Sequence, residues 1–415
     1  MSETLSTRNI DKRRWSVLVL QMLVGSVTAY VYNLTIYIGP FQEQLGWDPT
    51  VVILVWTVMM GVAFPGSLIG GKINDKYGSK AALKIGGLAF GIAVVASSFS
   101  TSAMMFVVID SIACMCMYII YTSQLANVAA LFPDRSSFAM GIFIGATSLG
   151  TAVMVPFTEW LTRSMDLMHG IALQGVIYGL ITVICGFLIV EAPEGYMPAG
   201  MAESMSKEEQ VNIEDGKPNY TVAEILKKPA FWILLLGVIF GSAFFNGMSA
   251  NLSLVVQASL SVSTVIGAWM YSAWQLGSAA GGAILGFASD KWFGPVKTFM
   301  LLCAVCAALC YALVAVGVST QILFIIVIVL LGFGCGSVLT LIPSTALQVF
   351  GQRNFGFTYG VMCLSGTVAA TIGTQITTRV APNMIFILGG TLLIIGAVFF
   401  LLMLLVMKKA KKEAN

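Results

Sequence analysis

The stretch GKINDKYGSK at residues 71–80 decides the fold, because it joins two long apolar runs and returns later in the chain. Its pattern of glycine, three residues, aspartate and lysine recurs as GFASDK at 286–291, 215 positions further on. The same offset of 215 relates Gly141-(x)3-Gly145 to Gly356-(x)3-Gly360. Two motifs that share one offset indicate an internal duplication, so we expect two halves of similar architecture.

The composition places most of the chain in lipid. Its residues are 58% hydrophobic and 10% charged, whereas soluble domains are about 45–50% apolar and about 25% charged. We predict an all-α membrane protein with twelve transmembrane helices in two pseudo-symmetric six-helix bundles, each helix crossing about 30 Å of hydrocarbon. The predicted spans are 15–39, 51–73, 81–99, 103–132, 136–161, 167–190, 230–257, 263–288, 298–317, 320–349, 355–378 and 383–407.

One long polar stretch separates the two halves. Residues 191–229 contain Pro193, Pro198 and Pro218 and a lysine–glutamate cluster but little apolar sequence, and Pro229 ends the stretch, which is typical of a linker. We therefore predict an N-terminal six-helix bundle at 1–190, a cytoplasmic linker at 191–229 and a C-terminal six-helix bundle at 230–415.

The basic residues predict the orientation in the membrane. With a cytoplasmic N-terminus, 20 of the 22 lysines and arginines lie on the cytoplasmic side, and Arg163 and Arg379 lie outside. This asymmetry follows the positive-inside rule. We expect a multi-pass protein of the cell (inner) membrane with both termini in the cytoplasm.

The composition also argues against several classes of function. A net charge of +3 gives no basic patch for nucleic acid, and the eight cysteines lie inside apolar runs, where they form no metal site. The one histidine, His169, is predicted to lie at the surface of an outer loop. Membrane enzymes need a nucleophile, acid–base or metal constellation that the spans do not offer. We therefore expect a monomer in the lipid bilayer that is not an enzyme and needs no cofactor or metal.

Residues 71–80 resemble the loop 2–3 signature of the major facilitator superfamily, G-x-x-x-D-[RK]-x-G-[RK]-[RK], with Ser79 in place of one basic residue. The motif predicts a cytoplasmic latch, in which an aspartate meets the N-terminus of a span in the other half and pairs with a basic side chain. Its glycines allow close approach of the helices. The expected gating residues are Gly71, Asp75, Lys76, Gly78, Arg135, Gly286, Asp290, Lys291 and Arg353.

Within that superfamily the chain is most similar to the oxalate/formate antiporter family, a relative of monocarboxylate transporters. The resemblance rests on short matches, which are YNLTIYIGP at 32–40, FPDR at 132–135, PAFW at 229–232, PST at 343–345 and RNFG at 353–356. It implies a secondary active transporter that moves a small organic solute, a carboxylate, by alternating access. Symport and exchange (antiport) both remain open.

Two positions depart from the family pattern. Members that carry small dicarboxylates resemble each other in having an arginine in span 8 and a lysine in span 11 that face the central cavity. Those positions are Gly282 and Met362 here, and the interiors of both spans contain no lysine or arginine. Because a buried anion needs a counter-charge, the alternative prediction is a carrier of a neutral or bulky organic compound, with extra cavity volume beside Gly282.

The candidate contacts to solute are therefore neutral, polar and aromatic. They share helix faces in span 1 and span 4 or lie in spans 7, 8 and 11. The alternative is that these side chains pack helices or sit at the membrane interface. The candidates are Tyr30, Asn33, Tyr37, Tyr118, Tyr121, Gln124, Asn246, Trp274, Gln275, Gly282 and Met362.

Two acids lie within predicted spans and are candidates for proton coupling. Asp110 lies about two turns inside span 4, and Glu159 lies near the outer end of span 5. For Glu159 the alternative is an ordinary i, i+4 ion pair with Arg163. For Asp110 the alternative is a structural role.

Overall fold

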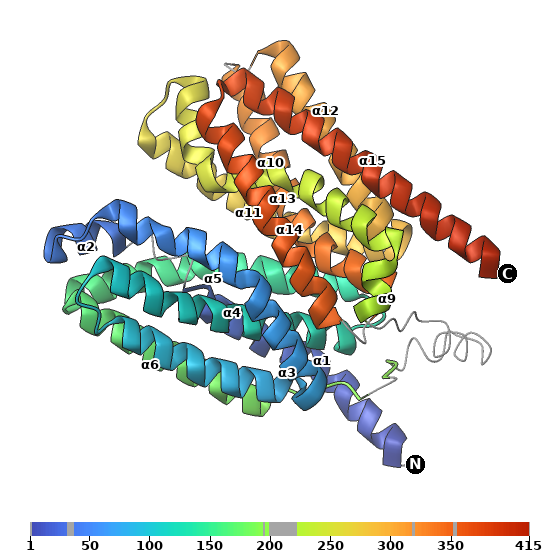
Figure 1. The fold of residues 1–415 in the computed structure, drawn as a ribbon, viewed down its shortest axis with the longest axis horizontal. Helices are drawn as coiled ribbons and strands as arrows, with labels where there is room; N and C mark the ends of the chain where they lie inside the picture. Colours follow the sequence, from blue (N-terminus) through green and yellow to red (C-terminus); the bar gives the residue numbers. More distant parts are fainter. Residues whose placement is uncertain are drawn as a thin grey trace. The chain divides into compact units, whose positions relative to one another are not determined.

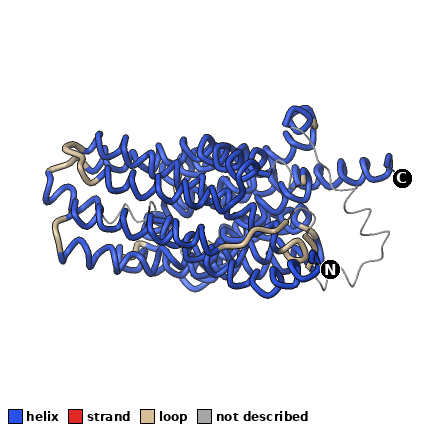
Figure 2. Tube along the Cα trace, turned by 90° about the horizontal axis from the view of Figure 1, so that it is seen from below, coloured by secondary structure: helices blue, strands red, loops and turns tan. Residues whose placement is uncertain are grey.

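The computed structural model describes residues 2–30, 37–193, 196–198, 222–317, 320–351 and 355–414. Over these ranges the chain forms helices joined by short connections and contains no β-strand (Figures 1 and 2). The helices are α1 (Ser2–Thr28), α2 (Ile38–Leu45), α3 (Pro49–Ser97), α4 (Ala103–Leu131), α5 (Ser136–Ser164), α6 (Leu167–Leu188), α9 (Val222–Lys227), α10 (Pro229–Leu260), α11 (Thr264–Ala288), the π-helix η2 (Ser289–Phe293), α12 (Pro295–Val316), α13 (Gln321–Phe350), α14 (Phe355–Arg379) and α15 (Pro382–Ala414).

The helices follow the predicted spans in order. Within the described residues, eight helices are long and apolar enough to cross a membrane. Predicted spans 2 and 3 fall in the single helix α3, which is broken at Gly78 by the non-helical angles φ 80° and ψ 169°. Only glycine adopts this positive φ without strain, so Gly78 turns the chain between the two spans.

The described chain divides into two compact units. Unit 1 comprises Met1–Asp134, Ala146–Asn219 and Gly351–Val361, and unit 2 comprises Arg135–Gly145, Tyr220–Phe350 and Met362–Asn415. Each unit thus includes a short piece from the other half of the sequence, at the beginning of α14 in unit 1 and of α5 in unit 2. The domain boundaries proposed from the sequence at 190 and 229 stay a prediction.

Small residues bring the helices of unit 1 together. A Cβ on Gly91 of α3 would lie 3.0 Å from the Cα of Gly179 and 2.9 Å from the carbonyl oxygen of Gly175, both on α6. Such contacts replace side-chain packing by backbone packing, as in other membrane helices. At one end of the unit, the Phe41 ring packs 4.8 Å from both Trp47 and Phe106.

Unit 2 uses the same kind of packing. Its helices α11 and α13 approach through Gly277 and Gly332, where an added Cβ would lie 2.9 Å or less from the backbone of the facing helix. The rings of Phe299 on α12 and Phe400 on α15 stack with centroids 4.1 Å apart. Close contact at these glycines fixes the spacing between α11 and α13.

The π-helix η2 explains an irregularity in the duplication. Gly294 has φ 75° and ψ 154°, close to the angles of Gly78. The two glycines are therefore structural counterparts, although they stand 216 positions apart rather than 215. A hydrogen bond from the Gly294 N–H to the Ser289 carbonyl, five residues back, closes the wider turn that holds the additional residue.

Candidate functional site

In unit 2, Asp290 lies at the N-terminus of α5. Its carboxylate accepts hydrogen bonds from the backbone N–H of Phe138 at 2.7 Å and of Ser137 at 3.1 Å. The first N–H groups of a helix have no partner within the helix and carry partial positive charge. The aspartate therefore caps α5 although it follows α11, and it joins segments from the two halves of the sequence inside one unit.

Glycines let α5 and α11 come close beside this cap. A Cβ built on Gly282 would lie 2.9 Å from Thr340 Oγ1 and 3.3 Å from the carbonyl oxygens of Gly141 and Gly336. The space beside Gly282 is thus filled by α5 and α13 in this conformation. The extra volume expected there from the sequence is absent, because the missing side chain admits neighbouring backbone instead of leaving a cavity.

The corresponding contact in unit 1 joins α3 and α14. A Cβ on Gly71 would lie 2.5 Å from the Cα of Gly356. Asp75 and Lys76 are exposed beyond this contact, and the Lys76 ammonium lies 5.0 Å from the centre of the Tyr77 ring. Arg353, predicted to take part in gating, lies outside the described residues.

The two glycine contacts differ by one helical turn. The 215-residue offset would place Gly141 on Gly286, the counterpart of Gly71, but Gly141 contacts Gly282 and Gly286 contacts Ser137. Four residues correspond to about one turn of helix. Duplicated small residues thus lie at the helix contact in both units. The register of the two facing helices in unit 2 differs by about one turn from that in unit 1.

Lys291 and Arg135, the remaining predicted gating cations, both lie at exposed positions of unit 2. The Lys291 ammonium is 5.6 Å from the Phe287 ring centre and 5.7 Å from that of Trp292. Arg135 immediately precedes α5, where its carbonyl accepts the N–H of Ala139. The structure therefore collects these cations near the Asp290 cap.

Glu191, which the sequence analysis did not single out, lies beside Gly78. Its carboxylate accepts the backbone N–H of Lys80, where α3 resumes after the break. In unit 2, Gln348 of α13 accepts the equivalent N–H of Val296 at 3.3 Å. Two residues at unrelated sequence positions serve the same turn, so the duplication pattern could not reveal either of them.

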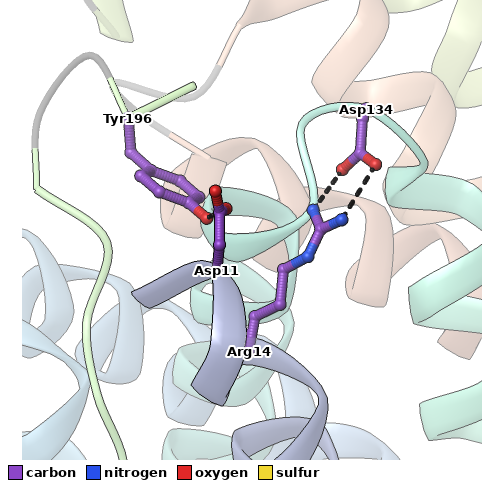
Figure 3. Close-up of polar contacts among 4 residues, drawn as sticks. All are labelled: Asp11, Arg14, Asp134 and Tyr196. Atoms are coloured by element: carbon purple, nitrogen blue, oxygen red, sulfur yellow. Dashed lines mark hydrogen bonds and ion pairs between the residues drawn. The ribbon is translucent and has the colours of Figure 1, made fainter. Parts of the chain in front are cut away.

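A polar cluster joins three segments of unit 1 (Figure 3). Arg14 of α1 forms an ion pair with Asp134, with Nη1 to Oδ1 at 2.7 Å and Nη2 to Oδ2 at 3.3 Å. The phenol of Tyr196, which follows α6, donates a hydrogen bond to Asp11. Burial raises the pKa of the Tyr196 phenol, so that this hydroxyl stays protonated and able to donate. We call these four residues the α1 clasp.

A second polar cluster lies buried in unit 1. Tyr30 and Asp110 have 1% and 0% of their surface exposed, and the Tyr30 hydroxyl donates to Asp110 Oδ1 at 3.4 Å. The Tyr37 hydroxyl donates to the side-chain oxygen Oε1 of Gln174, whose side-chain nitrogen Nε2 donates to the Thr158 hydroxyl at 2.9 Å. The ring centres of Tyr30 and Tyr37 are 6.4 Å apart, so the two predicted residues belong to one aromatic cluster.

The predicted residues of α4 lie in the same unit. Tyr118 is buried, and the Tyr121 ring lies 6.5 Å from that of Tyr359. The amide nitrogen of Gln124 donates to the backbone carbonyl of Gln21 at 2.8 Å. Gln21 is a polar residue on the buried face of α1 that the sequence analysis missed, because a single amide in an apolar run gives no sign of its partner.

The predicted residues of unit 2 are more dispersed. Trp274 is fully buried and donates to the Ser249 hydroxyl at 3.3 Å, whereas Asn246 donates to the Ser242 carbonyl of its own helix at 3.0 Å. Gln275 is half-buried, and Met362 is 1% exposed. Asn33 lies outside the described residues, and the side chain of Glu159 is not among those described. A role of these residues in binding solute stays a prediction.

Neither metal nor disulfide chemistry is suggested by the described part of the chain. Within it, no three histidine, cysteine, aspartate or glutamate side chains gather closely enough to hold a metal ion. The cysteines are free thiols. His169 lies at the exposed start of α6, where its ring is 3.1 Å from the Asp166 carboxylate. This hydrogen bond holds the pKa of Asp166 below its usual value.

Comparisons with known proteins agree with this architecture. The sequence model of the Major Facilitator Superfamily matches residues 18–374 and 269–415. The oxalate:formate antiporter of Oxalobacter formigenes is 23% identical, over 90% of this chain and 88% of its own length. Monocarboxylate transporter 2 of Meriones unguiculatus is 22% identical, over 90% of this chain and 81% of its own length.

Solved structures show the same fold. The proton:xylose symporter XylE, bound to 6-bromo-6-deoxy-D-glucose, superposes with a TM-score of 0.73 at 13% identity, over 94% of this chain and 95% of its own. The predicted all-α fold of twelve membrane helices is thereby confirmed. The chain belongs to the Major Facilitator Superfamily and is a multi-pass membrane transporter rather than an enzyme.

Proposed function

We propose that this transporter carries a small organic solute with a single carboxyl group across the cytoplasmic membrane, by symport or exchange. The observation that carries the alternating-access part is the cap that Asp290 places on α5. Its two hydrogen bonds, at 2.7 and 3.1 Å, join the two halves of the sequence through a few polar atoms and no covalent link. Such a contact can break and re-form during a transport cycle, so we propose that it acts as a gate.

The substrate class is supported by the relatives and by the charges of the spans. The relatives' names include an oxalate:formate antiporter and a monocarboxylate transporter. Throughout α11, and in α14 up to its final Arg379, there is no lysine or arginine. A dianion would lack a counter-charge beside these helices, whereas one carboxyl group can be bound by neutral hydrogen-bonding groups.

The second candidate is a neutral or bulky organic compound. It is favoured by Gly282 and Met362, which occupy the positions where the resemblance implies cations. Packing of α5 and α13 around Gly282 means that a bulky solute would need a conformation in which these helices separate. The first candidate needs no such space, and we therefore prefer it.

Counterflow in proteoliposomes tests both candidates. Purified protein would be reconstituted with formate, lactate, oxalate, neutral aromatic compounds or sterols inside, and uptake of the labelled compound would be measured. Exchange of monocarboxylates with little exchange of oxalate supports the proposal. Exchange of neutral compounds alone supports the second candidate, and efficient oxalate exchange contradicts both.

We also propose that Asp110 binds and releases a proton during transport. Its carboxyl group is wholly buried, its Oδ1 atom accepts a hydrogen bond from the Tyr30 hydroxyl, and its Oδ2 atom has no hydrogen-bond partner in the described chain. An ionised carboxylate without a cation is very unfavourable at membrane depth. The acid is therefore expected to be protonated in this conformation and to ionise when another conformation hydrates it.

The proposed setting is the inner membrane, with both termini in the cytoplasm and the protein acting as a monomer. Bacterial relatives such as the Oxalobacter antiporter support a cytoplasmic-membrane location. The excess of basic residues on one side supports the orientation. The transported solute and the surrounding lipid are the only partners that we propose.

A further inference from the structure

Two buried glutamines are in contact inside unit 1. Gln21 on α1 and Gln124 on α4 each have 0% of their surface exposed. The Gln124 amide nitrogen donates to the Gln21 backbone carbonyl at 2.8 Å. The other three amide atoms, Nε2 and Oε1 of Gln21 and Oε1 of Gln124, have no hydrogen-bond partner in the described chain.

Unpaired amide groups are unfavourable at this depth. Leaving one buried donor or acceptor without a partner costs about 1–3 kcal/mol in a protein interior, and no bulk water reaches the hydrocarbon region to satisfy it. Three such atoms on two contacting glutamines are therefore difficult to explain by stability alone. They indicate that a group outside the chain completes the hydrogen bonds.

Gln174 provides the comparison within the same unit. It is also 0% exposed, but its oxygen accepts from Tyr37 and its nitrogen donates to Thr158 at 2.9 Å. Unit 1 can thus give both polar atoms of a buried glutamine a partner from its own side chains. The Gln21 and Gln124 amides differ in offering unused hydrogen-bonding capacity.

The two glutamines lie at a similar distance along α1 and α4 from the cytoplasmic ends of these helices. Gln21 is six residues after Trp15, where the predicted first span begins, and Gln124 is seven residues before Leu131, the last residue of α4. At about 1.5 Å per residue, both lie roughly 10 Å from the ends that carry the cytoplasmic connections. A solute passing along α1 and α4 would encounter both amides together.

The chemistry of the pair selects its ligand. The free atoms are one N–H₂ donor and two carbonyl acceptors. A carboxylic acid matches this set, because its carbonyl accepts from the N–H₂ group and its O–H donates to a carbonyl. From Trp15 to the end of α1, and throughout α4, there is no lysine, arginine or histidine that would favour an anion instead. A bare carboxylate could accept from N–H groups but would leave both carbonyl oxygens without a donor.

We infer that Gln21 and Gln124 form a subsite that binds the carboxyl group of the transported solute in its protonated form. This inference rests on the proposed carboxyl-bearing solute and deepens it by naming contacts in the N-terminal half. Neutral amides would bind the carboxyl group without the two cations that the family resemblance implies at the positions of Gly282 and Met362. The fully enclosed position would then correspond to an occluded step, in which the acid is shielded from water.

The test uses Gln21→Met and Gln124→Met, which preserve side-chain length and remove the amides. Formate counterflow gives KM, and thermal unfolding with and without formate gives the stabilisation by ligand. We expect at least a tenfold rise in KM and loss of the formate-induced shift in Tm. Without formate, the Tm of Gln21→Met should be unchanged or higher, because both of the amide atoms that it removes lack partners.

The control is Gln174→Met, which should lower Tm without formate because Tyr37 and Thr158 lose their partner. If the Gln21 and Gln124 variants instead lower Tm in the same way and keep the wild-type KM, the pair is structural or binds water only, and the inference is wrong. Should a methionine variant fail to fold, Gln21→Asn, which retracts the amide by one methylene group, must still raise KM.

The outcomes for the wild type and for the variants separate the two proposals. Wild-type protein that neither exchanges formate or lactate nor is stabilised by them contradicts the proposed function, and the inference fails with it. Wild-type exchange that the glutamine variants leave unchanged contradicts only the subsite.

Discussion

The carboxylate of Asp290 accepts a 2.7 Å hydrogen bond from the backbone N–H of Phe138, a residue 152 positions earlier in the chain. The aspartate belongs to the second copy of the duplicated motif, and the N–H belongs to the first turn of α5. A charged acceptor at a helix N-terminus forms strong hydrogen bonds and interacts favourably with the helix dipole. The duplicated loop thus supplies a cap for a helix that arises from the other half of the sequence.

Asp290→Ala should destabilise this conformation by about 1–3 kcal/mol, because two backbone N–H groups lose a charged acceptor. Asp290→Asn should lose less, since its amide oxygen can still accept a hydrogen bond. Thermal unfolding of the purified protein in detergent measures both. Equal stability of the alanine variant and the wild type would show that water replaces the carboxylate without loss.

Gly71→Ala should also be destabilising, because the new Cβ would lie 2.5 Å from the Cα of Gly356. Forcing apart two backbones in contact typically costs about 1–3 kcal/mol. Gly61→Ala is the matched control in the same helix, since a Cβ there would meet nothing within 4 Å. The control should be neutral or more stable by about 0.5–1 kcal/mol from helix propensity. The same change in Tm for both variants would argue against the contact.

Asp110→Asn should remove accumulation driven by a pH gradient and keep counterflow, because the amide resembles the protonated acid and cannot ionise. Proteoliposomes with and without an imposed pH gradient distinguish the two activities. The control is Asp166→Asn, the same change at an exposed residue that caps α6, where asparagine also caps well. Gradient-driven accumulation that persists in Asp110→Asn would assign this acid a purely structural role.

The α1 clasp should be measurable by a double-mutant cycle. Arg14 and Asp134 have side chains that are 12% and 16% exposed, so their ion pair is better shielded than one at the surface. We expect Arg14→Gln and Asp134→Asn to show a coupling energy of about 1 kcal/mol in thermal unfolding. Lys12→Gln, an exposed cation on the same helix, should show no coupling to Asp134→Asn. A coupling as small as that control would mean that the pair adds nothing to stability.

The orientation in the membrane leads to a direct test. Single cysteines placed at Lys76 and Lys291, in a background without the native thiols, should both react with a membrane-impermeant maleimide from the cytoplasmic side alone. The duplicated motif and the positive-inside rule require both positions on one face. Labelling of the two cysteines from opposite faces would overturn the twelve-span topology.

The helices could be predicted from the sequence because lipid imposes a strong and local signal. A helical spanning segment must be long and apolar, so the apolar runs that end near Leu131 and Leu188 predict where α4 and α6 end. Hydropathy also separated two spans within α3. It could not show that the break is confined to Gly78, because the break depends on the backbone angles of that residue, and hydropathy carries no information about them.

The contacts among polar side chains were much less predictable. Tyr30 and Asp110 were both candidates, but their hydrogen bond joins residues 80 positions apart, and sequence alone did not pair them. Gln21 was missed entirely, because a lone glutamine in an apolar run is compatible with many positions on a helix. The Tyr196–Asp11 contact spans 185 positions, and Tyr196 lies in the segment predicted to be a linker.

The π-helix at Ser289–Phe293 has a consequence for how this chain tolerates insertions and deletions. A single wide turn absorbs one additional residue, so the glycine that follows keeps the geometry of its counterpart in the first half. Loss of one residue there would convert the turn to an ordinary α-helical one with little displacement downstream. The same deletion within α11 would instead rotate every later side chain by about 100°, so length variation among natural homologues should concentrate in these five residues.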